Sequence, residues 1–120
     1  MKILLADNDR DQLSLRAMLL RKGGLETFEA GDATSALELA AACKPECAVV
    51  DLRLPTEKLG LRLIRELKAL DSRMRVFVLT GSDPAHLTHY PERALIEEIV
   101  VKGSPSALLI RKLKATATAS

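Results

Sequence analysis

The chain has 120 residues, which suits one ordinary domain and leaves no room for a second. It is 48% hydrophobic and 28% charged, and its 18 basic and 16 acidic residues give a net charge of +2, which is typical of a globular domain. The charges are spread without a Lys/Arg stripe, and two Phe, one Tyr and no Trp are too few for a base-stacking platform, so composition argues against direct nucleic-acid binding.

Short apolar runs alternate with helical patterns along the whole chain. Continuous apolar runs bounded by polar residues predict buried strands, and apolar residues three or four apart predict amphipathic helices. The expected strands are 2–6, 25–30 (an edge strand), 47–51, 75–79 and 96–101, and the expected helices are 10–22, 33–43, 59–70, 84–90 (short) and 104–114. Residues 115–120 have no core face and are expected to fray as a tail or linker stump, so the predicted domain spans residues 1–114.

Polar residues mark the expected helix starts. Asp9 and Asp32 are predicted to cap the first two helices, because an Asp side chain accepts hydrogen bonds from free N–H groups in the first turn. Ser104 is predicted to cap the last helix, with Pro105 at its first position.

Five strand–helix alternations predict an α/β fold: a doubly wound parallel sheet with helices on both faces and right-handed crossovers. Ligands in such folds bind at the carboxyl ends of the strands. Four polar residues fall at those predicted ends, namely Asp7, Asp51, Thr80 and Lys102. We therefore expect one pocket that contains carboxylates, a hydroxyl and an ammonium group.

This set of groups suits phosphoryl transfer. Neighbouring carboxylates need a cation, and oxygen ligands in an incomplete cage suit Mg²⁺. Thr80 and Lys102 are good partners for phosphoryl oxygens, and an Asp can itself be the nucleophile. Positioning and charge neutralisation supply most of the catalysis in such reactions.

The same residues resemble the receiver domain of two-component response regulators, over the chain to about Lys114. Asp7-Asn8 is similar to the acidic pair of that family, and Asp51 before Leu-Arg-Leu-Pro is similar to the phosphoacceptor motif. Thr80-Gly81 resembles the switch residue and its small neighbour, and Lys102 resembles the phosphate-binding lysine. The resemblance implies a flavodoxin-like sheet with strand order 2-1-3-4-5.

By this resemblance, Asp51 accepts a phosphoryl group from a histidine kinase or a histidine phosphotransfer protein. Mg²⁺ would be held by Asp7, Asn8, Asp51 and the main-chain carbonyl of Arg53. Thr80 would then reshape the surface of the fourth helix, fifth strand and fifth helix, which signals to a downstream effector protein or domain and offers a possible homodimer interface. The implied protein is cytoplasmic, with no membrane or nucleic-acid contact, and is no enzyme beyond its own phosphorylation and dephosphorylation.

Three departures from the family pattern favour an alternative, a degenerate receiver that docks partners without phosphate. Asn8 replaces a carboxylate and is expected to weaken Mg²⁺ binding. Ile99 stands where an aromatic switch residue is usual, and Gly103 stands where the family has Pro, so a cis peptide there is not expected. Arg53 either reaches into the pocket or is a solvated surface residue.

Other motifs carry weaker hypotheses. His86 and His89 either bind a metal or are solvated, and solvation is favoured. Cys43 and Cys47 are expected to be reduced thiols in a cytosolic protein. A third function, a phosphatase of the haloacid-dehalogenase type, would use Asp7-x-Asp9 but leaves Asp51 unexplained. Asp9 is interpreted as a helix cap rather than a metal ligand.

Overall fold

A computed structural model describes residues 1–81 and 83–118 of the chain. Its sheet has five parallel strands in the order β2-β1-β3-β4-β5, which confirms the predicted fold class and strand order. The strands are β1 (Lys2–Ala6), β2 (Glu26–Ala30), β3 (Cys47–Asp51), β4 (Arg75–Thr80) and β5 (Ile96–Val101). The strand β2 lies at one edge of the sheet, as predicted, but its exposed and buried residues do not alternate strictly.

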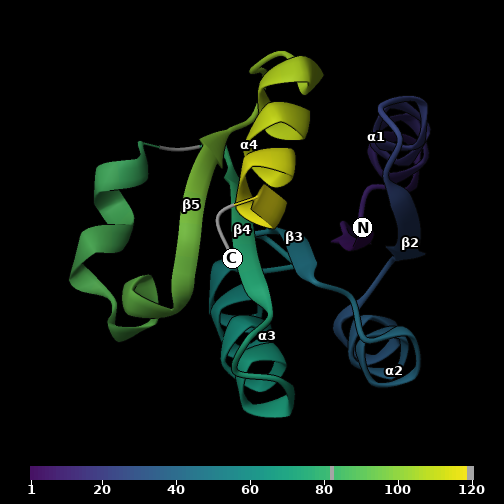
Figure 1. Cartoon of the computed structure of the whole chain (residues 1–120). Coiled ribbons are helices and arrows are strands. Elements are labelled where there is room, and N and C mark those ends of the chain that lie inside the picture. Colours follow the sequence, from purple (N-terminus) through teal and green to yellow (C-terminus); the bar gives the residue numbers. More distant parts are fainter. Residues whose placement is uncertain (82, 119–120) are drawn as a thin grey trace.

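Helices cover both faces of this sheet (Figure 1). One face carries α1 (Arg10–Lys22) and α4 (Ser106–Thr118), and the other carries α2 (Ala33–Cys43) and α3 (Glu57–Leu70). Two short 3₁₀ helices, η1 (Pro84–His89) and η2 (Pro91–Leu95), connect β4 to β5. None of the helices in the described part of the chain has the length and apolar composition needed to cross a membrane.

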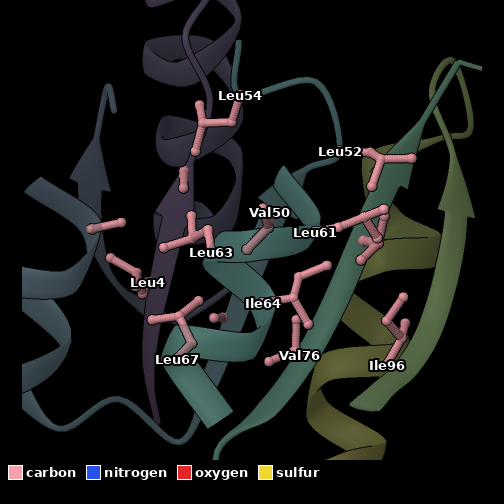
Figure 2. Close-up of a cluster of buried hydrophobic side chains, with 14 of the residues drawn as sticks. Leu4, Val50, Leu52, Leu54, Leu61, Leu63, Ile64, Leu67, Val76 and Ile96 are labelled. Atoms are coloured by element: carbon pink, nitrogen blue, oxygen red, sulfur yellow. The ribbon is translucent and has the colours of Figure 1, made fainter. Parts of the chain in front are cut away.

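The core has two halves because alternate residues of a strand point to opposite faces. Ile3 and Leu5 of β1 belong to the cluster under α1 and α4, and Leu4 belongs to the cluster under α2 and α3. Figure 2 shows the second cluster, where Ile64 and Leu67 of α3 pack over the sheet. Fully burying one such side chain stabilises the fold by about 1.5–3 kcal/mol, so each helix is fixed by its apolar face.

Helix α3 begins earlier than predicted. The sequence pattern placed its start at Leu59, whereas the helix begins at Glu57. Thr56 is the cap, since its hydroxyl accepts a hydrogen bond from the N–H of Leu59 at 3.2 Å. Glu57 in the first turn also suits the positive end of the helix dipole.

Helix α4 is shifted along the chain relative to the prediction. It begins at Ser106, so the prediction that Ser104 caps the helix with Pro105 at its first position is wrong. It continues to Thr118, so the prediction that residues 115–118 fray is also wrong, while residues 119–120 lie outside the described part of the chain. Alanine has the highest helix propensity, which favours this extension. The Thr116 hydroxyl also donates to the Lys112 carbonyl at 3.0 Å.

The β4–β5 connection differs most from the expected pattern. The short helix predicted at residues 84–90 is the 3₁₀ helix η1, and the second 3₁₀ helix, η2, was not predicted. Pro84 and Pro91 begin the two helices, and proline lacks the N–H that a continuous α-helix through both segments would need. The segment is held by buried Leu87 and by Glu92, which pairs with Arg65 of α3.

Candidate functional site

The strand register brings the predicted site residues to one edge of the sheet. Ala6 pairs with Val50, so Asp7 and Asp51, the next residue of each strand, come level with each other. Thr80 pairs with Val101, so Lys102 follows directly beside it. Parallel strands all end at the same edge, which places these side chains together.

Asp51 is the centre of this group. It is 3% exposed, and both of its carboxylate oxygens accept hydrogen bonds. The N–H of Arg53 donates to Oδ1 at 3.1 Å, and the ammonium Nζ of Lys102 donates to Oδ2 at 2.7 Å. A backbone donor and a cation therefore hold the carboxylate in one orientation.

A pocket of about 260 Å³ opens above Asp51. Its lining residues are Asp51, Leu52, Arg53, Glu57, Thr80, Gly81 and Lys102. The N–H of Lys102 donates to the Thr80 carbonyl at 2.7 Å, which ties the ends of β4 and β5 together. Arg53 is exposed and also lines the pocket, so it belongs to the site entrance rather than to the remote surface.

Asp7 lies beside Asp51 but is not among the residues that line the pocket. It is 1% exposed; the N–H of Asp9 donates to its Oδ1 at 2.9 Å, and Nη1 of Arg16 lies 3.1 Å from its Oδ2. Asn8 is exposed. Asp9 caps α1 by accepting from two first-turn N–H groups, which confirms its predicted capping role.

Burial raises the pKa of the Asp7 carboxyl above its ordinary value. The neighbouring charge of Asp51 raises this pKa further, whereas the N–H of Asp9 and the charge of Lys102 lower it. Burial outweighs the favourable contacts, so the ionised form of Asp7 costs folding free energy.

The family model of the response regulator receiver domain matches residues 3–114. The chain belongs to this family. Among curated relatives, the receiver is 27% identical over 111 residues to Sporulation initiation phosphotransferase F of Bacillus subtilis, covering 82% of this chain and 86% of that protein. It is 29% identical to the transcriptional regulatory protein PrrA of Mycobacterium tuberculosis, covering 95% of this chain but only 48% of PrrA, so it spans about half of that relative.

Solved receiver structures share the fold. A CheY-like receiver domain from Methanospirillum hungatei superposes with a TM-score of 0.85 at 22% identity, covering 96% of this chain and 91% of that one. The response regulator TrrA from Thermotoga maritima, solved with Mg²⁺–BeF, gives a TM-score of 0.83 at 22% identity, covering 95% and 96%. The family match also removes the support for a haloacid-dehalogenase-type phosphatase.

The structure describes the positions where the sequence departs from the pattern that the resemblance implies. In the described residues the one cis peptide joins Leu54 to Pro55, so the Lys102–Gly103 bond is trans, as expected. Gly103 has φ 93°, a left-handed conformation that glycine adopts without strain. Ile99 is half-buried and packs against the core cluster under α2 and α3. The expected fourth helix is replaced by η1 and η2.

Two site residues of the receiver were missed by sequence reasoning. Arg16 contacts Asp7 from α1, and Glu57 lines the pocket from the first turn of α3. Thr56 before an acidic residue is a helix-start signal that identifies Glu57. The sequence gives a weaker indication for Arg16. Its neighbour Ala17 is buried, which indicates only that the Arg16 side chain lies near the side of α1 that faces the sheet.

The two histidines do not form a metal site. Nε2 of His86 lies 2.7 Å from Oε1 of Glu57, and its ring packs edge-on against Tyr90. Within residues 1–81 and 83–118 there is no group of three or more His, Cys, Asp or Glu side chains able to hold a metal. Cys43 and Cys47 are unpaired, as predicted, and burial raises the pKa of Cys47 to about 11, so this thiol is not reactive.

The Asp7→Asn variant is expected to be more stable than the unmodified receiver at neutral pH without metal. Because the pKa of Asp7 is raised in the folded state, its contribution to stability is present at low pH and is lost as the pH rises through that value. The advantage of the variant should therefore grow from acidic to neutral pH in urea unfolding.

Asp32→Ala is the contrasting control. The backbone N–H of Ser35 lowers the pKa of exposed Asp32, so this group stabilises the fold above its unfolded pKa and loses that effect as the pH falls. Asp32→Ala should destabilise at neutral pH and converge with the unmodified protein in acid. Equal pH slopes for the two variants would contradict the Asp7 assignment.

Proposed function

We propose that this receiver accepts a phosphoryl group on Asp51 from a histidine kinase or a histidine phosphotransfer protein. The observation that supports this most is the Asp51 carboxylate, buried below an open pocket with Nζ of Lys102 at 2.7 Å. A carboxylate oxygen attacks phosphorus, the bond from phosphorus to the donor histidine nitrogen breaks, and that nitrogen keeps the electron pair. Lys102 and Thr80 are positioned to bind the transferred oxygens.

Magnesium is the cation we propose for this reaction. The available donors are oxygens alone: the carboxylates of Asp7 and Asp51, the amide of Asn8 and the main-chain carbonyl of Arg53. This set fits Mg²⁺, which is commonly held by one or two carboxylates and keeps several waters. When bound, the ion neutralises charge on the transferred phosphoryl group. TrrA, which shares the fold, was solved with Mg²⁺–BeF.

The proposed output surface consists of η1, η2, β5 and α4. Thr80 ends the strand that leads into η1, so a phosphoryl group that attracts its hydroxyl would pull on this connection. Ile99 of β5 replaces the usual aromatic, so we propose that the response passes through the main chain and the packing of η1. A downstream effector protein or domain reads this surface, which is also the candidate homodimer face.

The cellular location and the limits of the activity follow from the same proposal. We place the receiver in the cytoplasm, where kinases of this class and unpaired cysteines such as Cys43 and Cys47 are found. Its chemistry is limited to its own phosphorylation and dephosphorylation, and it makes no direct contact with nucleic acid. We propose that the receiver unit spans residues 1–114, with the last residues of α4, to Thr118, extending beyond it.

Acetyl phosphate, with and without Mg²⁺, tests the proposed function. We expect intact-mass spectrometry to detect one added phosphoryl group that requires Mg²⁺, and borohydride trapping with peptide mapping to assign it to Asp51. Asp51→Asn is the matched control and should gain nothing. The contradicting result is a receiver that gains no phosphoryl group from either acetyl phosphate or a phosphorylated histidine phosphotransfer protein. That result would favour the phosphate-independent docking module that Asn8, Ile99 and Gly103 suggest.

A further inference from the structure

Arg16, in α1, forms an ion pair with Asp7 beside the proposed phosphoacceptor Asp51. The position of Arg16 in the helix does not by itself predict this contact. Its Nη1 lies 3.1 Å from Oδ2 of Asp7, and the two side chains are 16% and 1% exposed. An ion pair held this far from water is screened less than a surface pair. The attraction in this pair is therefore screened less than in the exposed Arg62–Glu66 pair on α3, and it offsets part of the cost of burying Asp7.

The charges at the site already balance without a metal ion. Asp7 and Asp51 bring two negative charges, and Arg16 and Lys102 bring two positive ones in direct contact with them. Neighbouring carboxylates require a cation, and here the protein itself supplies one to each. The exposed Asn8 adds an amide and no further negative charge.

The geometry also restricts access to Asp7. Both of its oxygens are engaged, one by the N–H of Asp9 and the other by Arg16. Asp7 is absent from the lining of the pocket above Asp51, although the two carboxylates are neighbours. An ion shared by Asp7 and Asp51 would therefore lie against the guanidinium on Oδ2, whose positive charge opposes it.

We propose that Arg16 is a built-in counter-cation that competes with the divalent cation for Asp7. Mg²⁺ binds only when Arg16 leaves Asp7, so the cation affinity of the pocket is set by Arg16 as well as by Asn8. This inference rests on the proposed function, because it concerns the cation of the same phosphoacceptor pocket. It makes Arg16 a positioning residue, since it acts through Asp7 and touches no phosphoryl group.

Magnesium titration without a phosphoryl donor tests this inference. Dissociation constants for MgCl₂ are measured at constant ionic strength by calorimetry, together with amide NMR shifts of Asp51 and Arg53. Arg16→Gln is expected to bind Mg²⁺ at least about tenfold more tightly than the unmodified receiver, because a cation in contact with the ligand carboxylate is removed. Arg16→Lys keeps the charge and is expected to stay close to the unmodified value.

Arg21→Gln is the matched control. Arg21 lies on the same helix and pairs with Glu29 at 2.9 Å, and its loss removes the same net charge away from the site. Equal gains in Arg16→Gln and Arg21→Gln would overturn the inference by showing a general charge effect. No gain in Arg16→Gln, with folding verified by circular dichroism, would overturn it as well.

The outcomes separate this inference from the proposed function. Tighter Mg²⁺ binding in Arg16→Gln without any phosphoryl adduct on Asp51 would support the role of Arg16 and reject phosphoacceptance. A phosphoryl adduct on Asp51, combined with unchanged Mg²⁺ affinity in Arg16→Gln, would support phosphoacceptance and reject the role of Arg16.

Discussion

Gly60→Ala is expected to lower the free energy of unfolding by about 3 kcal/mol. A Cβ at residue 60 would lie 1.8 Å from the carbonyl oxygen of Leu52 and 2.8 Å from its carbonyl carbon. These are backbone atoms, so relief requires α3 to move away from the end of β3. Urea unfolding measures the loss.

The sign of this effect is informative, since Gly→Ala inside an exposed helix is stabilising by about 1 kcal/mol. Gly31→Ala is the control, because nothing lies within 4 Å of a Cβ added there. It should change stability by less than about 0.5 kcal/mol. A Gly60→Ala protein as stable as the Gly31→Ala protein would show that the contact between α3 and Leu52 is not close.

Lys102→Met is expected to slow phosphorylation of Asp51 by acetyl phosphate about a hundredfold. The ammonium group contacts Oδ2 of Asp51 at 2.7 Å, so its loss removes both the orientation of the nucleophile and a positive charge beside the transferred oxygens. The initial labelling rate, followed by intact-mass spectrometry, measures the effect.

Lys102→Met is also expected to lower stability, because the buried Asp51 carboxylate loses the cation that pairs with it, although the Lys102 side chain is itself 37% exposed. Lys112→Met is the matched control. It removes a lysine that pairs with Glu98 outside the pocket, and its labelling rate should equal that of the unmodified receiver. Equal rates in the two variants would remove Lys102 from the proposed chemistry.

Much of the fold was predictable because its signals are local. The strand β3 is a short apolar run that ends at Asp51, and β5 ends in apolar residues directly before Lys102, so both polar residues could be assigned to one sheet edge from the chain alone. The mixture of polar and apolar residues in β2 likewise indicated an edge strand, and β2 lies at one edge of the sheet. Strand order came from the family resemblance and agrees with the observed sheet.

The missed features depend on contacts between distant segments. The pairing of Arg16 with Asp7 requires the angle at which α1 crosses the sheet, and helical spacing does not contain that angle. The close approach of Gly60 to Leu52 is of the same kind. The second 3₁₀ helix, which begins at Pro91, was missed because a five-residue helix is too short to show helical periodicity.

The connection between β4 and β5 has an energetic consequence. Each 3₁₀ helix is a single short segment closed by i→i+3 bonds, such as His86 N–H to Asp83 and Arg93 N–H to Tyr90. Local opening of this connection breaks the hydrogen bonds of one turn at a time. In an α-helix of the same length the i→i+4 hydrogen bonds form and break cooperatively, so opening would break several of them together. The buried side chains of Leu87 and Glu92, the latter paired with Arg65, are then the main barriers to rearrangement. We expect this connection to open before the sheet does, because the sheet is held by the ladders of five paired strands.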